Sequence, residues 1–317
     1  FRKYTLTQNM RLAGAAAAQA SGQIITAEQQ GQLDYAALLI NISRNESTAL
    51  CNVLDFADAD VATIGLPSLT YFTEAQHHLA VLWLYPDGVV DPQTTVLCST
   101  NVAVDGWNTT AQELNPNEAV ELLSTDTFEE VDDVKQFLKR TMNEKALHGF
   151  RKNGVPDHKL ILKVGDVCLI TRAMQSLRLA NNTRVRITRI GKYCIQAISL
   201  TDPGGRSVSI PRIPFRFRMP YGQSFQLTRM QFPLRLAYAM TFNKSQSQTL
   251  DRVLIDVTGP PFSHGQFYVA MSRVRDCQKI ALYVREEQLL ENAETPTGSM
   301  ATVTNIVYQD VLLFNSS

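Results

Sequence analysis

Three short apolar segments near the C-terminal end of the chain constrain its fold more than any other feature. They span Leu236–Thr241, Val253–Val257 and Lys279–Val284, and a polar loop and a helical segment separate them. Strands that alternate with helices are typical of a parallel sheet that carries helices on its faces. Ligands of such sheets bind beyond the carboxyl ends of the strands. The polar loop that follows the first segment is therefore expected to be functional.

The polar loop and the helical segment carry side chains that suit phosphate chemistry. The loop, residues 241–249, has amide, hydroxyl and amine groups that can donate hydrogen bonds to a phosphodiester backbone. A helix cap followed by a turn is the plainer interpretation of the same residues. The later segment predicts a helix with Ser263 as its N-cap. Its apolar stripe consists of Phe267, Ala270, Met271 and Val274. Arg273 projects away from that stripe, as an arginine that neutralises a transferring phosphoryl group would.

The chain between His148 and Leu234 has a different pattern. Short segments of alternating apolar and polar residues follow one another, and turn signals such as Asn181-Asn182 separate them. Pro203–Ser207 reads as a hairpin turn and not as a phosphate-binding loop, because it lacks the spacing and the terminal Lys-Ser/Thr of a P-loop. The pattern predicts a small β-barrel or sandwich inserted between the strands of the larger α/β domain.

The net charge of zero hides a strong segregation of charge along the sequence. Residues 1–150 contain 8 Lys and Arg against 19 Asp and Glu, residues 151–252 contain 18 against 4, and residues 253–317 contain 4 against 7. Aromatic residues are interleaved with the arginines of the central block. This pattern indicates a surface that binds a polyanion, and we expect nucleic acid. The alternatives are a solvated basic face without a ligand and a surface that docks an acidic protein.

The remaining composition is that of an ordinary globular protein with reduced thiols. The five cysteines are scattered without Cys-x-x-Cys spacing, which favours buried thiols in the cytosol or nucleus over disulfides or zinc. No metal site is expected, since His77 and His78 are adjacent and point in different directions. No apolar run reaches the length of a membrane span, and we expect no membrane partner. The first residue, Phe1, is not an initiator methionine, so the sequence is interpreted as a fragment.

Several motifs resemble those of one family. "MTFNKSQSQT" over residues 240–249 and "YVAMSRVR" over residues 268–275 resemble the fifth and sixth motifs of the Pif-type helicases of superfamily one, in the version that Helitron transposons encode. "LTQNMR", which ends at Arg11, is similar to the fourth motif, and residues 100–108 are similar to the family's "TN-x-x-VD-x-N" element. "VPDHKLILKVGD", "NNTR" and "IPRIPFRF" match the family's small β-barrel insert. The resemblance covers most of the chain.

The resemblance implies an α/β fold: the second RecA-like lobe of a helicase, with a parallel sheet, flanking helices and an inserted small SH3-like β-barrel subdomain. It places the first part of the lobe, with helical segments, in residues 1–147 and the inserted barrel in residues 148–234. The concluding part of the lobe would occupy residues 235–290, and a C-terminal tail residues 291–317.

The resemblance also implies roles for individual residues. Arg11 and Arg273 would be the catalytic residues that touch the γ-phosphate of ATP, and Gln248 would join them in binding the nucleotide. The residues that would contact DNA are Asn101, Thr241, Asn243, Lys244, Ser245 and Gln246. From the residues alone, Asn101 is equally well explained as the N-cap of the helix that follows it.

The sequence has no P-loop of the form G-x-x-x-x-G-K-[ST] and no Asp-Glu pair at the end of an apolar strand. ATP and Mg²⁺ would then be held mainly by a missing first RecA-like lobe that precedes Phe1 in the same protein. The resemblance implies an ATP-dependent helicase that moves 5′ to 3′ on single-stranded DNA and unwinds duplex DNA, in DNA repair, recombination, telomere maintenance or transposition. This chain alone would be inactive as an ATPase. Its location would be nuclear, or cytoplasmic if the protein is viral or prokaryotic.

Three residues depart from the family's pattern. Ser247 and Asn182 stand where the family has glycine, and Ala173 replaces an asparagine. A residue other than glycine is strained where φ is positive, although asparagine tolerates that region better than most. These departures leave a second interpretation open: a transposon-derived module that binds nucleic acid and has no ATPase activity.

Overall fold

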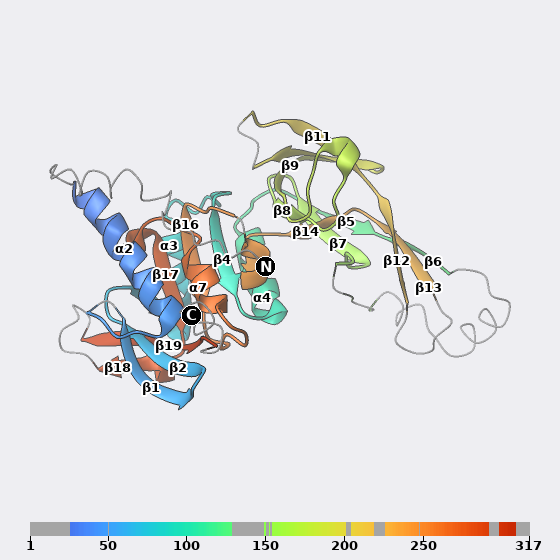
Figure 1. Cartoon of the computed structure of the whole chain (residues 1–317). Coiled ribbons are helices and arrows are strands. Elements are labelled where there is room, and N and C mark those ends of the chain that lie inside the picture. The colour runs from blue at the N-terminus through green and yellow to red at the C-terminus, as the bar shows by residue number, and fades with distance from the viewer. Residues whose placement is uncertain are drawn as a thin grey trace, which may run out of the picture. The chain divides into compact units, whose positions relative to one another are not determined.

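The computed structural model describes residues 26–49, 51–128, 149, 152, 154–200, 204–218, 226–246, 248–291 and 298–308. The chain divides into two compact units, which are unit 1 (Phe1–Trp107 and Ala239–Ser317) and unit 2 (Asn108–Tyr238) (Figure 1). Two residues that the sequence singled out, Arg11 and Ser247, lie outside the described residues.

Unit 1 is built on a five-stranded parallel sheet with the strand order β15-β4-β16-β17-β3. Its strands are β3 (Thr70–Thr73), β4 (Thr94–Cys98), β15 (Ala239–Thr241), β16 (Arg252–Asp256) and β17 (Ile280–Val284). Every residue of β4 and β17 is buried, as is typical of parallel strands that are covered on both faces. The prediction of an α/β fold with a parallel sheet is confirmed.

The first predicted strand of this sheet is divided between the two units. β14 (Leu234–Leu236) pairs with β8 (Val167–Ile170) in unit 2, and only Ala239–Thr241 enters the parallel sheet. Between these strands, Ala237 donates its N–H to Val167 O. The continuous apolar run from Leu236 to Met240 therefore serves two sheets, and hydrophobicity alone does not reveal where one ends and the other begins.

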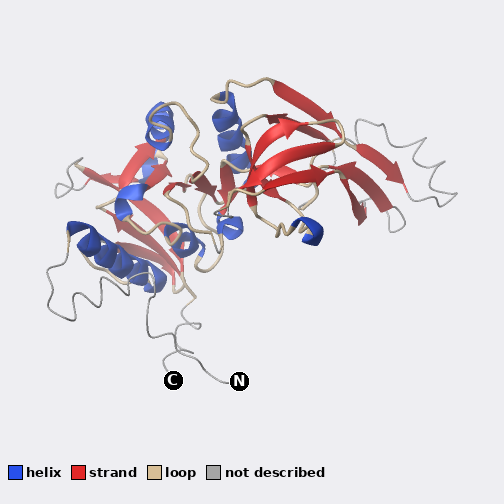
Figure 2. Ribbon diagram, turned by 90° about the horizontal axis from the view of Figure 1, so that it is seen from above, coloured by secondary structure: helices blue, strands red, loops and turns tan. Residues whose placement is uncertain are grey.

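The rest of unit 1 consists of helices and a second sheet, and Figure 2 shows both kinds of element. The helices are α2 (Ala27–Arg44), α3 (His77–Leu84) and α7 (Gln266–Met271), while α4 (Asn101–Glu113) begins in unit 1 and ends in unit 2. The four-stranded antiparallel sheet has the order β1-β2-β19-β18. Its strands are β1 (Asn52–Asp58), β2 (Val61–Leu66), β18 (Leu289–Glu291) and β19 (Ser299–Ile306).

α2 has well-defined caps at both ends. Thr26 and Gln29 form a capping box at its start, and Asn45 in the left-handed conformation ends it. Asn305 of β19 donates its side-chain amide to Ile42 O and to Asn45 Oδ1. The antiparallel sheet therefore holds the C-terminal end of α2.

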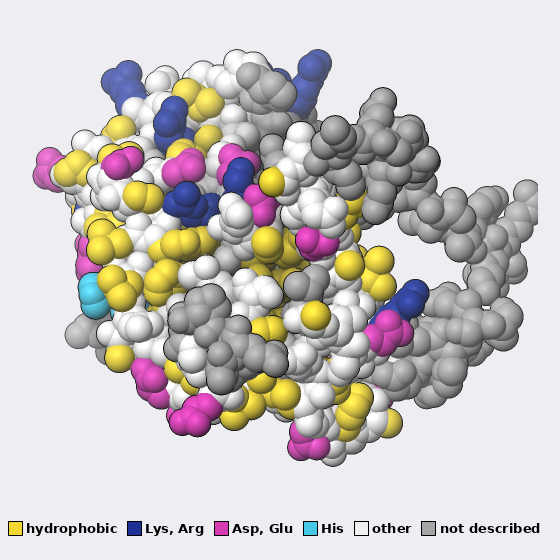
Figure 3. Space-filling model, turned by 90° about the vertical axis from the view of Figure 1, so that its left-hand side faces the viewer, with side chains coloured by type: hydrophobic (Ala, Val, Ile, Leu, Met, Phe, Trp, Pro, Cys, Tyr) yellow, Lys and Arg dark blue, Asp and Glu magenta, His cyan; other side chains and the backbone are white. Residues whose placement is uncertain are grey.

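The surface of unit 1 carries apolar side chains in small groups. On the face drawn in Figure 3 they are spread among acidic and basic side chains. Exposed members of unit 1 include Ile40 on α2, Phe56 on β1 and Leu82 on α3. Scattered apolar residues of this kind are normal on protein surfaces. None of the helices in the described ranges has the length and apolar character needed to span a bilayer.

Unit 2 is made of antiparallel strands arranged as β11-β10-β9-β8-β14, β12-β13-β6 and β5-β7. The strands not yet placed are β5 (Ala119–Leu123), β6 (Thr125–Phe128), β7 (Lys159–Lys163), β9 (Arg184–Ile190), β10 (Cys194–Ser199), β11 (Ser207–Pro211), β12 (Ile213–Arg218) and β13 (Gln226–Gln231). One apolar cluster, with Leu162, Val185, Ile195 and Phe232 among its members, forms the core. Within the described residues β11 and β14 are the end strands of their sheet and do not pair with each other. The SH3-like barrel therefore stays a prediction.

Unit 2 begins earlier in the chain than the predicted insert. β5 pairs with β7 and β6 pairs with β13, so residues 119–128 belong to unit 2 and not to the first part of the lobe. The boundary between the units falls inside α4.

Asn182 stands where the resemblance expected glycine, and its φ of 63° shows that this position requires the left-handed region, which asparagine tolerates.

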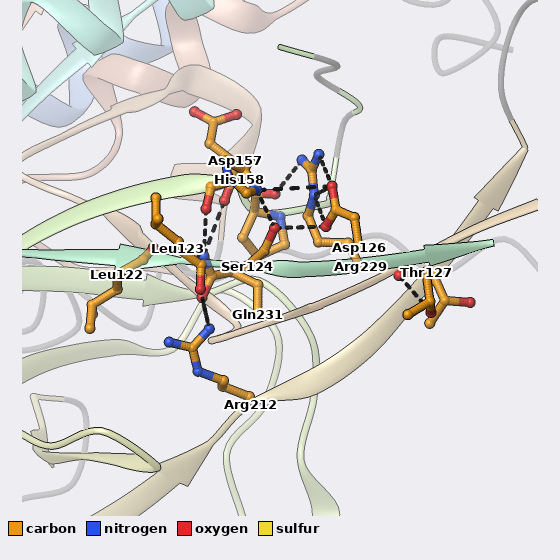
Figure 4. A network of polar contacts seen from close by, with 12 residues as sticks. Leu122, Leu123, Ser124, Asp126, Thr127, Asp157, His158, Arg212, Arg229 and Gln231 are labelled. Carbon is orange, nitrogen blue, oxygen red and sulfur yellow. Dashed lines mark hydrogen bonds and ion pairs between the residues drawn. The ribbon is translucent and has the colours of Figure 1, made fainter. Parts of the chain in front are cut away.

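A buried ion pair joins β6 to β13 in unit 2 (Figure 4). Arg229 Nη2 lies 2.9 Å from Asp126 Oδ2, and the two side chains are 1% and 5% exposed. Ser124 donates its hydroxyl to Asp126 Oδ1, and His158 Nδ1 lies 4.0 Å from Oδ2. Burial raises the pKa of Asp126, but the hydrogen bonds from Arg229 and Ser124 and the charges of Arg229 and His158 outweigh burial. The pKa of Asp126 therefore lies below its ordinary value.

A second carboxylate of unit 2, Asp166, is fully buried between β7 and β8. Its Oδ1 accepts hydrogen bonds from Asn115 Nδ2 at 2.8 Å and from the Tyr238 hydroxyl at 2.9 Å. Its Oδ2 accepts from Gln112 Nε2 and from the N–H of Lys163. Four donors thus satisfy one carboxylate, which ties the end of α4 to the β7–β8 turn and to the segment after β14.

Candidate functional site

The carboxyl ends of three neighbouring strands meet at one edge of the parallel sheet in unit 1. Thr241 at the end of β15 pairs with Cys98 at the end of β4, and Cys98 pairs with Asp256 at the end of β16. The polar loop, the start of α4 and the connection into α7 all leave the sheet from this edge. Because ligands of open α/β sheets bind beyond the carboxyl ends of the strands, this edge is the candidate site.

The polar loop after β15 forms a short 3-10 helix, η3 (Phe242–Ser245). Ser245 is buried, and its hydroxyl donates to Phe242 O at 2.7 Å. Asn243 and Gln246 are exposed, whereas Thr241 and Lys244 are half-buried. Of the residues predicted to contact DNA from this loop, Asn243 and Gln246 are thus the most accessible. The side chain of Ser245 instead holds the conformation of the loop.

Arg273 lies beyond the end of α7 and not within the helix, where the sequence predicts it. α7 spans only Gln266–Met271, and its N-cap is Gly265, with a φ of 67°, instead of the predicted Ser263. Arg273 therefore lies just past the C-terminal end of α7 and not on its outer surface. The reason is that the helix begins later and ends earlier than its apolar periodicity suggests.

The guanidinium of Arg273 connects α7 to the polar loop. Its Nη1 donates to Ser245 O at 3.3 Å and to Gln248 O at 3.2 Å. Its Nε donates to Val269 O, and its Nη2 donates to Ser272 Oγ. The structure thus brings together Arg273 and Gln248, which were predicted to bind the nucleotide, and Ser245, which was predicted to contact DNA. A change that moves the polar loop must also move the carbonyl groups that receive the hydrogen bonds of Arg273.

α2 fixes the end of α7 next to Arg273. Tyr35 of α2 donates its hydroxyl to Met271 O. Burial, followed by the nearby Cys277 and Asp276, raises the pKa of Tyr35 above its ordinary value. The hydroxyl therefore keeps its proton and its role as a donor. Tyr35 is a positioning residue that sequence analysis missed, because it is separated from α7 by most of the chain.

The start of α4 adds a second set of polar groups to the edge. Asn101 is exposed at the first position of the helix, but the N-cap is Thr100, whose Oγ1 accepts the N–H of Ala103 at 3.3 Å. The N-cap interpretation of Asn101 is therefore wrong. Ser99 donates its hydroxyl to Gly259 O, and a Cβ atom at Gly259 would lie 2.8 Å from Ser99 Oγ. Only glycine allows the two loops to approach so closely.

Asp256 is a buried acidic residue at this edge that sequence analysis did not single out. Its Oδ2 accepts a hydrogen bond from Trp107 Nε1 at 2.8 Å, and its Oδ1 accepts from the N–H and the hydroxyl of Thr258. The Trp107 ring packs against those of His77 and Tyr283. Burial, with a contribution from Asp256, raises the pKa of Tyr283 to about 12. The only signal in the sequence was an aspartate within the apolar segment Val253–Val257.

The arrangement suits an anion better than a cation. The edge presents amide, hydroxyl and guanidinium donors, and among the described residues no three His, Cys, Asp or Glu side chains gather as a metal site requires. Arg273 has the donors to contact a phosphate, but a P-loop is absent from the sequence. These residues therefore fit one side of a nucleotide site, and they do not fit its phosphate cradle or its Mg²⁺ site.

Comparisons with known proteins agree on the fold. No protein-family model and no curated protein sequence matches the chain. A crystal structure of the Pif1 helicase from Candida albicans matches with 17% identity and a TM-score of 0.55, over 93% of this chain and 59% of that chain. A Bacteroides Pif1 helicase in complex with ADP-AlF3 and single-stranded DNA matches with 17% identity and a TM-score of 0.53, over 93% and 55%. Bacteroides Pif1 bound to single-stranded DNA matches with 19% identity and a TM-score of 0.50, over 79% and 48%.

The chain spans about half the length of the solved structures that it matches. Sequence identities below one fifth are evidence of a shared fold and not of a shared activity. Over most of its length, the chain shares the fold of these Pif1 helicase structures.

Proposed function

We propose that the chain is the second motor lobe of an ATP-dependent DNA helicase that moves 5′ to 3′ on single-stranded DNA and unwinds duplex DNA. The observation that carries this proposal is the meeting of the polar loop, the start of α4 and Arg273 at one edge of the parallel sheet. Likeness of fold to Pif1 structures that hold single-stranded DNA supports it. The basic unit 2 corresponds in this proposal to the inserted small barrel.

In the proposal, DNA lies along the edge made by the polar loop and the start of α4. The exposed amides of Asn243, Gln246 and Asn101 contact the phosphates, and the half-buried Thr241 and Lys244 lie beside them. Ser245 acts through the position of its backbone, because its hydroxyl is bonded within the loop. Contacts of this type carry little sequence information, which suits a protein that moves along any strand.

Arg273 is the proposed link between nucleotide and DNA. It stands between α7 and the carbonyl groups of Ser245 and Gln248, so a phosphate that attracts the guanidinium would release the polar loop. Arg11 and Gln248 complete this side of the nucleotide site in the proposal. ATP and Mg²⁺ supply the driving reaction and would be held chiefly by a first RecA-like lobe of the same protein. Nuclear location and roles in DNA repair, recombination or Helitron transposition belong to the proposal through the motif resemblance.

The second candidate is a transposon-derived module that binds nucleic acid without any ATPase partner. Both candidate functions need the same DNA-binding edge, and they differ only in the role of Arg273. In a module without a motor, Arg273 serves solely as the structural tie between α7 and η3. Restoring the first lobe and measuring ATP turnover of an Arg273→Ala variant separates the two.

We expect the chain to bind a fluorescently labelled single-stranded oligonucleotide with an affinity that falls as salt rises. The double variant Asn243→Ala/Gln246→Ala should bind about thirtyfold more weakly, since each amide contributes roughly 1 kcal/mol through its hydrogen bonds. Fluorescence anisotropy measures both quantities. The matched control is Gln30→Ala/Asn52→Ala, which makes the same chemical change on α2 and β1.

Two results would contradict the proposal. Equal affinities of the Asn243→Ala/Gln246→Ala variant and its control would remove the polar loop from the DNA site. ATP turnover by the purified chain would contradict the assignment of the nucleotide cradle to another lobe, because the sequence holds no P-loop.

A further inference from the structure

The outer face of the sheet in unit 2 carries two arginines that a β-bulge brings to the same side. β9 and β10 pair with the register Arg186↔Ile198 and Arg189↔Gln196, and a register shift lies between these pairs. Residues 186 and 189 would point to opposite faces of a regular strand. The bulge places one extra residue between them, so both side chains lie on the same face of the sheet. Bulges redirect side chains in this way in other sheets as well. Arg186 and Arg189 are both exposed there.

The spacing of the two arginines suits consecutive phosphates. Their partners on β10, Ile198 and Gln196, are two residues apart, which corresponds to about 6.6–6.8 Å along a strand. An extended nucleic-acid strand places successive phosphates at a comparable separation. Ser209 of β11 lies opposite Gln196 in the same sheet and extends the row of polar groups across it.

No carboxylate neutralises these arginines in the part of the chain that the structure describes. Between residues 158 and 246, the described residues contain a single acidic side chain, Asp166, and it is buried. Two exposed arginines of unit 1 do have carboxylate partners: Arg44 pairs with Glu46, and Arg285 pairs with Glu287. An unpaired basic face repels itself and gains from binding a polyanion.

An exposed aromatic ring lies in the turn that follows β9. Tyr193 in the β9–β10 turn is 77% exposed, and Lys192 Nζ lies 5.5 Å from the centroid of its ring. The turn is tight: Gly191 donates its N–H to Cys194 O, and a Cβ at Gly191 would lie 2.8 Å from that oxygen. Tyr193 is therefore presented from a well-defined backbone and not from a long loop.

We propose that the outer face of β9, β10 and the β9–β10 turn is a binding site for single-stranded nucleic acid. Arg186 and Arg189 contact its phosphates, and Tyr193 stacks on a base. Unpaired bases offer their faces to an aromatic ring, whereas a duplex hides them, so the ring favours a single strand. This site is separate from the loops of the parallel sheet, and it does not depend on ATP or on a second lobe.

The test compares matched variants by fluorescence anisotropy with a labelled oligothymidine and a labelled duplex, over a range of NaCl concentrations. Arg186→Gln/Arg189→Gln should make the slope of log K against log[NaCl] shallower by about 1.4 for the single strand, since each lost phosphate contact removes about 0.7. The control Arg44→Gln/Arg285→Gln removes the same charge from unit 1 and should keep the wild-type slope. Tyr193→Ala should weaken binding of the single strand about fivefold or more, with little change for the duplex.

The outcomes separate this site from the proposed function. If Arg186→Gln/Arg189→Gln keeps the wild-type slope while Asn243→Ala/Gln246→Ala loses affinity, the inference is overturned and the proposed function stands. Equal losses for single strand and duplex in Tyr193→Ala would overturn the stacking. Tighter binding of polyglutamate than of DNA to the wild-type chain, abolished in Arg186→Gln/Arg189→Gln, would show an acidic protein as the partner. A wild-type chain that binds no single strand at any salt concentration would overturn both proposals.

Discussion

Replacing Asp126 by alanine is expected to lower the free energy of unfolding by about 3–5 kcal/mol, because the change leaves the buried guanidinium of Arg229 without its counter-ion. Arg229 is 1% exposed and cannot turn toward water while β6 and β13 stay paired. Arg229 Nη1 also donates to Pro156 O, a neutral acceptor that cannot balance the charge of the guanidinium. Urea denaturation followed by circular dichroism measures the change.

The control for this prediction is Glu118→Ala, which removes an exposed carboxylate of the same unit and should change stability by less than about 0.5 kcal/mol. The pair also predicts a pH dependence. The pKa of Asp126 is lowered in the folded state, so its stabilisation is present above the unfolded pKa and is lost as the pH falls through the lower, folded pKa. Asp126→Ala should therefore show a weaker loss of stability on acidification than the wild type. Equal stabilities of Asp126→Ala and Glu118→Ala at neutral pH would contradict the assigned role of the ion pair.

Replacing Asp166 by alanine is expected to cost about 4 kcal/mol, since each buried donor left without a partner costs roughly 1–3 kcal/mol. The change removes the acceptor of four donors, which are the hydroxyl of Tyr238, the side-chain amides of Asn115 and Gln112, and the N–H of Lys163. The cost is not the full sum, because some donors will reach water after local rearrangement. Urea denaturation measures it.

A second variant tests whether the cost is shared among the four donors to Asp166. Tyr238→Phe removes one of the four donors and leaves the other three satisfied, so it should cost no more than about 1–1.5 kcal/mol. If Tyr238→Phe were as destabilising as Asp166→Ala, the single hydrogen bond from Tyr238 would account for the whole cost, and a cost shared among four donors would be contradicted.

The sequence is sufficient to predict the parallel sheet of unit 1, because its central strands are short continuous apolar runs. Val253–Asp256 and Ile280–Val284 are buried throughout, and polar residues follow them at the carboxyl edge. The polar loop was singled out by the same means, since a run of amides, hydroxyls and an amine is unusual directly after a buried strand, whereas Arg273 was singled out by its position relative to a helical apolar stripe. Local composition is enough for features of this kind.

Features that depend on distant pairing could not be predicted. Asp126 and Arg229 are 103 residues apart, and neither segment shows by itself that the other will be its partner. The assignment of residues 119–128 to unit 2 likewise rests on the pairing of β5 with β7 and of β6 with β13. Leu236 and Ala239 lie in one apolar run but in different sheets, because Leu236 pairs with a strand of unit 2 and Ala239 with a strand of unit 1.

The central claim is that the loops at the carboxyl edge of the parallel sheet form the DNA-binding site of unit 1. Hydrogen exchange of the chain, measured by mass spectrometry with and without a saturating single-stranded oligonucleotide, tests it most directly. The account predicts slower exchange in residues 241–246 and 99–104 when DNA is bound, and no change in the β1–β2 hairpin, residues 52–66. Unchanged exchange in both loops at saturating DNA would contradict it.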